Sequence, residues 1–199
     1  MAIVSENQRK HTSKNPLQRY LIRKFHDKIY LIIESTNITH ILDAGCGEGF
    51  GMRALISYNQ NLQFVGLDNN LIALIWGKNH IISHQPILCG DAYKLPFEDN
   101  AFPMVVCLEV LEHLNEPALC LQELIRVTSQ FLLISVPHEP FFRIANFLRG
   151  KNFARFGNDI DHVNWFTVSK LNRLLSSQNI EIINHSLSFP WQMVLAKKV

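Results

Sequence analysis

The chain contains 199 residues with a formal net charge of +2, of which 47% are hydrophobic and 18% charged. These values fit a single folded globular domain, and the charge is too small to indicate nucleic-acid binding by itself. Lys and Arg gather between Arg9 and Lys28 and between Arg143 and Arg155, and we interpret both segments as solvated surfaces. No uninterrupted apolar run approaches about 18 residues, so we expect no transmembrane segment.

Cysteine and histidine spacing gives no sign of a metal site. His80 and His84 have the i, i+4 spacing of metal ligands, but no carboxylate or thiol accompanies them, so we interpret them as a helix end. The first ten residues are polar and lack the apolar core of a signal peptide. The chain has four cysteines, which are Cys46, Cys89, Cys107 and Cys120. They show no paired metal-ligand spacing, which favours a reducing cytoplasm.

The first elements in chain order are a polar tail and a long helix. Residues 1–15 are predicted to be a mobile polar tail, and residues 16–199 a single domain. Asn15 and Pro16 are typical of a helix start, and apolar residues at helical spacing extend that helix to about Glu34.

Short β-type and helical segments then alternate, which indicates βαβ units and a parallel sheet. The predicted strands are Ile38–Ala44, Leu62–Leu67, Pro86–Cys89, Met104–Leu108 and Phe131–Val136. The predicted helices between them are Met52–Tyr58, Asn70–His80 and Pro117–Thr128. After an irregular segment over 137–162, the pattern resumes with a helix, Thr167–Ser177, and two closing strands, Ile180–His185 and Met193–Lys198.

The turn after the first strand has the sequence Asp43-Ala-Gly-Cys-Gly-Glu-Gly-Phe-Gly51. A strand, a glycine-rich turn and a helix form a common nucleotide-binding arrangement. The dinucleotide fingerprint fails at Phe50, where a third glycine is required, so we expect no preference for nicotinamide dinucleotides. The motif resembles motif I of the class I S-adenosylmethionine-dependent methyltransferases. That resemblance implies cofactor contacts from Asp43, Gly45, Cys46, Gly47 and Gly49.

Two further strands end in acidic residues. Asp68, followed by Asn69, can accept from both ribose hydroxyls of the cofactor, although a turn or helix-cap role is the alternative. Asp91 and Ala92 occupy the positions that face the adenine ring in the family that the chain resembles, and the alternative is an Asx turn.

The fourth strand continues into Met104-Val-Val-Cys-Leu-Glu-Val-Leu-Glu-His113. This segment resembles small-molecule methyltransferases of the ubiquinone-biosynthesis type, and it adds Leu108 and Glu109 to the cofactor site. Pro103 stands where that family usually has Asp. Enzymes that methylate the amino groups of DNA bases usually carry Asn/Asp-Pro-Pro-aromatic here, so we expect no DNA substrate.

The resemblance implies a Rossmann-like, doubly wound α/β fold. Its sheet would have seven strands in the order 3-2-1-4-5-7-6, with the last strand antiparallel. The candidate bases are His113, which follows the fourth strand, and His138, which follows the fifth. Glu139 and His162, which also flank the irregular segment after the fifth strand, are further candidates. His113 can instead shape the cofactor pocket or cap a helix, and the other three can have structural roles.

The segment 137–162 is rich in phenylalanine and in helix breakers. It is interpreted as a substrate-side insertion, either a lid over an apolar acceptor, a weak contact with a membrane surface, or a packed helix. The predicted function is methyl transfer from S-adenosylmethionine to a small-molecule acceptor. The alternatives are a non-catalytic S-adenosylmethionine-binding module and an enzyme that acts on RNA or protein. The oligomeric state and the methylated atom stay open.

Overall fold

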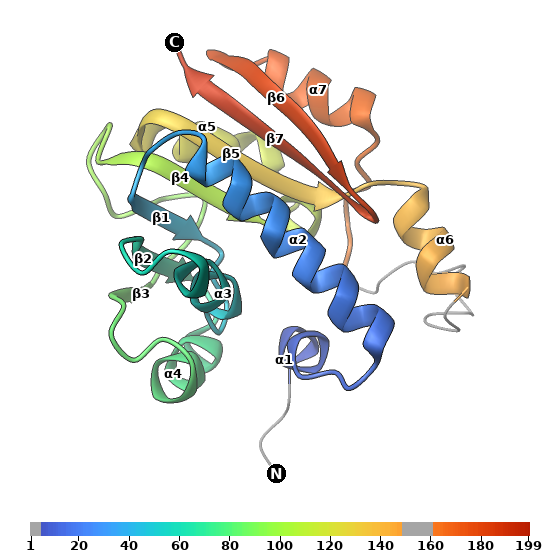
Figure 1. The fold of residues 1–199 in the computed structure, drawn as a ribbon. Coiled ribbons are helices and arrows are strands. Elements are labelled where there is room, and N and C mark those ends of the chain that lie inside the picture. Colours follow the sequence, from blue (N-terminus) through green and yellow to red (C-terminus); the bar gives the residue numbers. More distant parts are fainter. Residues whose placement is uncertain (1–4, 149–160) are drawn as a thin grey trace.

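Seven strands form one sheet in the computed structural model, which describes residues 5–148 and 161–199. The strand order is β3-β2-β1-β4-β5-β7-β6, which confirms the predicted fold class (Figure 1). Strands β1 to β5 run parallel, whereas β7 is antiparallel to both β5 and β6. The strands are β1 (His40–Ala44), β2 (Gln63–Asp68), β3 (Ile87–Cys89), β4 (Phe102–Leu108), β5 (Thr128–Pro137), β6 (Ile180–Ser188) and β7 (Trp191–Lys198).

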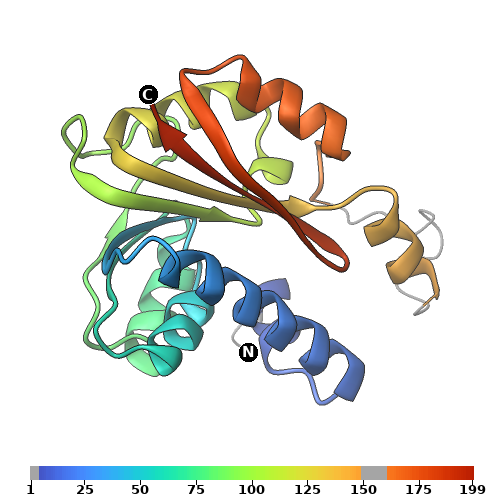
Figure 2. The same ribbon diagram turned by 45° about the horizontal axis from the view of Figure 1, so that its top comes forward.

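Helices cover both faces of the sheet, as Figure 2 shows. Helices α2, α3 and α4 cover one face, and α5 and α7 cover the other. The helices are α1 (Glu6–His11), α2 (Pro16–Glu34), α3 (Phe50–Tyr58), α4 (Leu71–His80), α5 (Pro117–Val127), α6 (Phe141–Leu148) and α7 (Val168–Ser176), with a 3-10 turn η1 (Leu111–His113). Within the described part of the chain, no helix is long and apolar enough to span a membrane.

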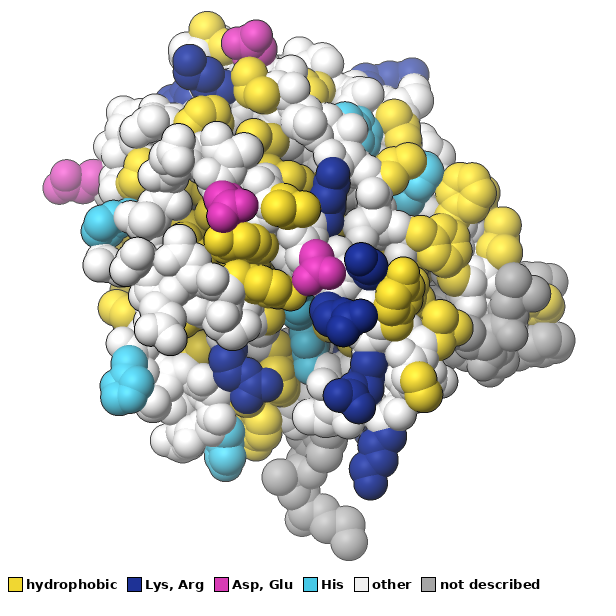
Figure 3. Space-filling model, viewed as in Figure 1, with side chains coloured by type: hydrophobic (Ala, Val, Ile, Leu, Met, Phe, Trp, Pro, Cys, Tyr) yellow, Lys and Arg dark blue, Asp and Glu magenta, His cyan; other side chains and the backbone are white. Residues whose placement is uncertain are grey.

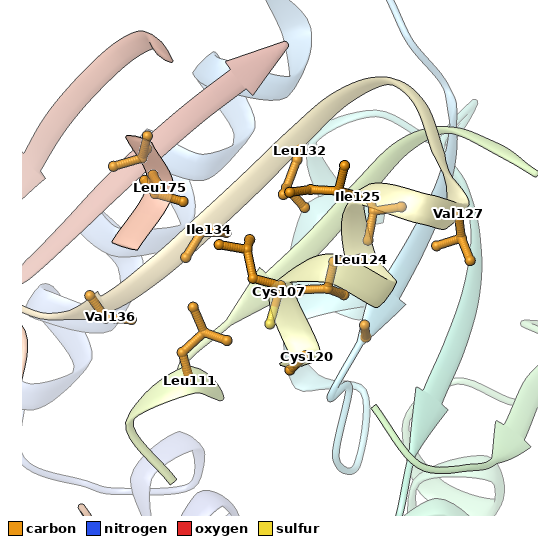
Figure 4. Close-up of a cluster of buried hydrophobic side chains, with 14 of the residues drawn as sticks. Cys107, Leu111, Cys120, Leu124, Ile125, Val127, Leu132, Ile134, Val136 and Leu175 are labelled. Atoms are coloured by element: carbon orange, nitrogen blue, oxygen red, sulfur yellow. The ribbon is translucent and has the colours of Figure 1, made fainter. Parts of the chain in front are cut away.

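Alternate residues of the central strands enter two separate cores, because successive side chains of a strand point to opposite faces. Val105 and Cys107 of β4 pack under α5 and α7, whereas Met104 and Val106 pack under α2 and α3. Figure 4 shows the first of these clusters, where side chains of β4, β5 and α5 meet. Central strands buried on both faces read as continuous apolar runs, which is why β4 and β5 were recognisable in the sequence.

Local capping chemistry places the helix starts. The Asn15 side chain accepts hydrogen bonds from the backbone N–H groups of Leu17 and Gln18, and Pro16 begins α2. Asn70 caps α4 in the same way, so the segment predicted as helical from Asn70 begins one residue later. Pro103 is the second residue of β4.

Two segments contain more helix than the sequence predicted. A helix, α1, occupies Glu6–His11 within the region predicted to be a polar tail, and a Ser5–Gln8 capping box closes its first turn. Helix α6 occupies Phe141–Leu148 within the segment predicted to be irregular. The rest of the predicted lid, residues 149–160, lies outside the described residues.

Candidate functional site

The glycine-rich turn between β1 and α3 contains glycines in backbone conformations that other residues rarely adopt. Gly45 has φ of 90°, and a Cβ there would lie 2.2 Å from Cγ2 of Val110. Gly47 has φ of 54°. The N–H groups of Gly45 and Cys46 donate to the carbonyl oxygen of Leu67, at 2.7 and 3.1 Å. The turn is therefore held against the end of β2 with its backbone exposed to the cavity beside it.

Asp68 connects this turn to the end of β2. Its Oδ2 accepts from the backbone N–H of Gly47 at 2.8 Å, and its Oδ1 accepts from the N–H of Asn70 at 2.8 Å. A carboxylate oxygen can accept more than one hydrogen bond, so Asp68 keeps acceptor capacity for a ligand hydroxyl. Asp68 therefore has the role in the turn and helix cap that the sequence offered as an alternative, and this role does not exclude a hydrogen bond to a ribose.

Asp43 at the end of β1 is only 4% exposed. Burial, followed by the negative charge of Asp68, raises the pKa of Asp43 to about 7. A carboxyl group held in this environment is sensitive to any positive charge or hydrogen-bond donor that enters the cavity.

A cavity of about 830 Å³ lies over the carboxyl ends of β1, β2 and β4. Ligand sites typically measure roughly 300–1,000 Å³. The cavity brings together all but one of the predicted cofactor residues: Asp43, Gly45, Cys46, Gly47, Asp68, Asn69, Asp91, Ala92, Leu108 and Glu109. The exception is Gly49, which is the N-cap of α3 with φ of 80° and whose Cβ position lies against Ile82.

Two of these residues have additional structural partners. The carboxylate of Asp91 accepts from the N–H of Tyr93 at 2.9 Å, which is the Asx turn considered as an alternative. Glu109 has φ of 60°, a backbone region that non-glycine residues rarely adopt, and Trp191 donates its indole N–H to Glu109. Uncommon backbone conformations are concentrated at functional sites.

Helix α1 forms a wall of the cavity that the sequence did not predict. Ser5 and Asn7 each donate to the buried Glu48 carboxylate at 2.5 Å. His11 stacks on Phe50 with ring centroids 4.7 Å apart. The Ser5-x-x-Gln8 pattern was the available signal for this helix, because a capping box precedes a helical turn. Figure 3 shows basic side chains gathered on this face, over α1 and the start of α2.

Aromatic side chains line another part of the same cavity. Trp191 lies 5.0 Å from Phe25 and 6.5 Å from Phe142, measured between ring centroids. The ammonium group of Lys10 lies 5.2 Å from the centre of the Trp191 ring. This wall offers an apolar, aromatic surface in the same cavity as the acidic strand ends.

His113 and His138 occupy different environments. His113 ends η1 and lines the cavity, and its Nδ1 lies 2.9 Å from the carbonyl oxygen of Asp161. His138 follows β5, packs 4.9 Å from Phe141, and is not among the described residues that line the cavity. Burial and the nearby His185 lower the pKa of His138. Of the two, only His113 reaches the site.

The chain matches a family model described as a methyltransferase domain over residues 42–130. It is 27% identical over 132 residues to a probable S-adenosylmethionine-dependent methyltransferase of Mycobacterium tuberculosis, covering 63% of this chain and 46% of the relative. It is 32% identical over 81 residues to the ubiquinone biosynthesis O-methyltransferase of Coxiella burnetii, covering 39% of this chain and 34% of the relative. The aligned part thus spans about a third to a half of these relatives' length.

Solved structures share the fold over nearly the whole chain. Magnesium protoporphyrin IX methyltransferase from Synechocystis PCC 6803, with bound S-adenosylhomocysteine, superposes with a TM-score of 0.74. The alignment covers 96% of this chain and 92% of that one at 15% sequence identity, so it shows the fold alone. Residues 42–130 therefore match a methyltransferase domain, and the described chain has the fold of solved S-adenosylmethionine-dependent methyltransferases.

Proposed function

We propose that the chain binds S-adenosylmethionine and transfers its methyl group to a small-molecule acceptor with apolar surface. The observation that carries this proposal is that one cavity joins the glycine-rich turn and the acidic strand ends to an aromatic wall. When bound, S-adenosylmethionine supplies an electrophilic methyl group on a sulfonium. The protein's main contribution would then be to hold the two reactants in line and exclude water.

Residues of this chain fit the parts of that cofactor. The carboxylate of Asp68 can accept hydrogen bonds from ribose hydroxyls, and Asp91 with Ala92 would bind the adenine end. Gly45 has no side chain, as the close approach of Val110 requires, so the backbone of the turn can form a shelf for the cofactor. Glu109 and Leu108 complete the wall at the end of β4.

His113 is the residue that we propose as a general base, where the acceptor must lose a proton. Its ring lines the cavity and its Nδ1 is held by a backbone carbonyl oxygen, so Nε2 is available to an acceptor. His138 would act at most through other residues, because the described cavity does not include it.

A labelled-methyl assay tests the function. The protein is incubated with S-adenosylmethionine labelled in the methyl group and a metabolite extract, with Asp68→Ala as the impaired variant and exposed Asp99→Ala as the matched control. We expect transfer of label to a small molecule by the wild type and by Asp99→Ala. Cofactor binding without any transfer would favour the non-catalytic module, and label found only in RNA or protein would replace the proposed acceptor class.

We also propose a reducing compartment such as the cytoplasm. The support is the state of the thiols: Cys46, Cys107 and Cys120 are buried, and none of the four cysteines forms a disulfide. Fractionation of cells that express the tagged protein tests this location.

A further inference from the structure

Three side chains that commonly bind metal ions meet at one wall of the cavity. Glu112 and His113 belong to η1, and His162 belongs to the segment that leads to α7. One ligand atom from each lies within 4.8 Å of the other two. All three residues line the cavity. The sequence separates His162 from the other two by the whole of α5, β5 and α6, so spacing alone does not reveal the cluster.

The side chain of Glu112 is buried without a hydrogen-bond partner among the described residues. Glu112 is 1% exposed, and within the described part of the chain neither of its oxygens has a hydrogen-bond partner. An isolated buried carboxylate is costly, and buried charges are normally paired or bound to metal ions.

The orientation of His113 is that of a metal ligand. Its Nδ1 lies 2.9 Å from the carbonyl oxygen of Asp161, which can only accept, so Nδ1 carries the proton. In the neutral tautomer with this proton, the other ring nitrogen, Nε2, has the lone pair that can bind a metal ion. Histidines that bind metals usually donate their second ring N–H to a carbonyl or carboxylate in this way.

Aromatic packing accounts for the positions of the His113 and His162 rings but not for the burial of Glu112. His113 and His162 make an edge-to-face contact with centroids 5.0 Å apart, and Phe142 lies 5.4 Å from His162. Such contacts are common among buried aromatic side chains. They supply no hydrogen-bond donor to Glu112, so a purely structural cluster leaves both oxygens of that carboxylate unexplained.

We propose that Glu112, His113 and His162 bind one divalent transition-metal ion. Two imidazoles and one carboxylate suit zinc, cobalt or ferrous iron, whereas magnesium and calcium prefer oxygen ligands. Around a tetrahedral zinc ion with bonds of about 2.0–2.1 Å, the ligand atoms lie about 3.3 Å apart. The present spread of up to 4.8 Å therefore requires the side chains to close by about 1.5 Å.

Three protein ligands leave a coordination position open toward the cavity, as in catalytic metal sites. On the proposed methyltransferase function, this position would take the oxygen of an acceptor hydroxyl, and the ion would then replace His113 as the group that promotes loss of the hydroxyl proton. The ion lowers the pKa of that hydroxyl, its proton passes to water, and the oxygen then attacks the methyl carbon as the carbon–sulfur bond breaks. Metal binding itself does not depend on that function.

Cobalt(II) titration of the chelator-treated full chain tests the site. Visible absorption of bound Co²⁺ reports low-coordinate nitrogen and oxygen ligation, and competition with Zn²⁺ gives the affinity for zinc. We expect one equivalent per chain. His162→Ala and Glu112→Gln should weaken binding by more than about 100-fold, since changes to outer partners alone cost 10–100-fold.

The matched control is His84→Ala, because His80 and exposed His84 form the other pair with ligand spacing. Binding that survives His162→Ala but is lost in His84→Ala would overturn the proposal in favour of a surface site, and so would stoichiometric binding unaffected by any variant. Circular dichroism confirms folding, and Glu112→Gln keeps the side-chain shape. Binding of S-adenosylmethionine is measured separately by calorimetry. If Co²⁺ does not bind, the proposed methyltransferase function still stands, and if S-adenosylmethionine does not bind, the metal site can still be tested.

Discussion

At the residue scale, the Asp68 side chain both stabilises the local structure and lines the cavity. It holds the glycine-rich turn through Gly47 and the start of α4 through Asn70, and it presents its carboxylate to the cavity. Removal of the carboxylate would take away a hydrogen bond to the cofactor and would also loosen the turn that binds it. Both effects weaken cofactor binding.

We predict that Asp68→Ala weakens S-adenosylmethionine binding by about 1.5–3 kcal/mol, the range for a hydrogen bond to a charged group. Isothermal calorimetry measures the change, and Asp99→Ala, on the exposed surface, should bind as the wild type does. Unchanged affinity in a folded Asp68→Ala protein would remove this residue from the proposed cofactor site.

At the scale of elements, the site depends on close contact between α4 and the glycine-rich turn. A Cβ at Gly77 of α4 would lie 2.3 Å from the backbone oxygen of Glu48. A Cβ at Gly51 in α3 would meet nothing within 4 Å. We therefore expect the same substitution to have different consequences in α4 and α3.

We predict that Gly77→Ala destabilises the protein by about 1–3 kcal/mol, because backbone at that distance must move. Gly51→Ala should be neutral or stabilising by up to about 1 kcal/mol, since alanine is the better helix former. Urea denaturation gives both values. Equal effects at the two positions would mean that α4 does not pack against the turn as described.

The hydrogen bonds from Ser5 and Asn7 to Glu48, and the stacking of His11 on Phe50, attach α1 to the site. We predict that Glu48→Ala releases α1, so that its backbone amides exchange with solvent faster and S-adenosylmethionine binds more weakly. Hydrogen-exchange mass spectrometry follows the first effect and calorimetry the second. Exposed Glu98→Ala is the matched control. Continued protection of α1 in Glu48→Ala would assign its attachment to the His11–Phe50 stacking instead.

At the scale of the whole molecule, stability is linked to pH through buried histidine. His26 of α2 is 6% exposed and its ring lies 5.5 Å from that of His11. Burial, followed by the charge of Lys10, lowers the pKa of His26 to about 4, while Asp27 opposes this shift. The ring of His26 therefore stays neutral in the folded state at pH values below 6.5, at which the unfolded chain already binds a proton there.

Because the folded pKa is the lower one, the stabilising contribution is complete above pH 6.5 and is lost as pH falls toward 4. We predict that the wild type loses about 2 kcal/mol more than His26→Gln between pH 8 and pH 5. Urea denaturation at both pH values gives the difference. His11, whose pKa is also lowered by burial, to about 2, remains in both proteins. Parallel pH profiles would show that His26 is not buried as a neutral ring.

The sequence by itself determined the fold class, the strand order implied by its family resemblance and most of the candidate cofactor site. These features depend on local signals. The apolar runs of β1 to β5 mark buried parallel strands, and Asn15 and Asn70 mark helix starts. Residues at the carboxyl ends of parallel strands necessarily share one edge of the sheet, so Asp43 and Asp68 could be brought together before the structure was known.

Only the tertiary structure decided which distant segments surround that edge. It brought α1 over the cavity and placed His162 beside Glu112 and His113, whereas it kept His138 away from the described cavity wall. Gly49, with the same local motif signal as its neighbours, serves as a helix cap. The physical reason is that hydrophobic periodicity and capping act over a few residues, whereas contacts across α5, β5 and α6 depend on the path of the whole chain.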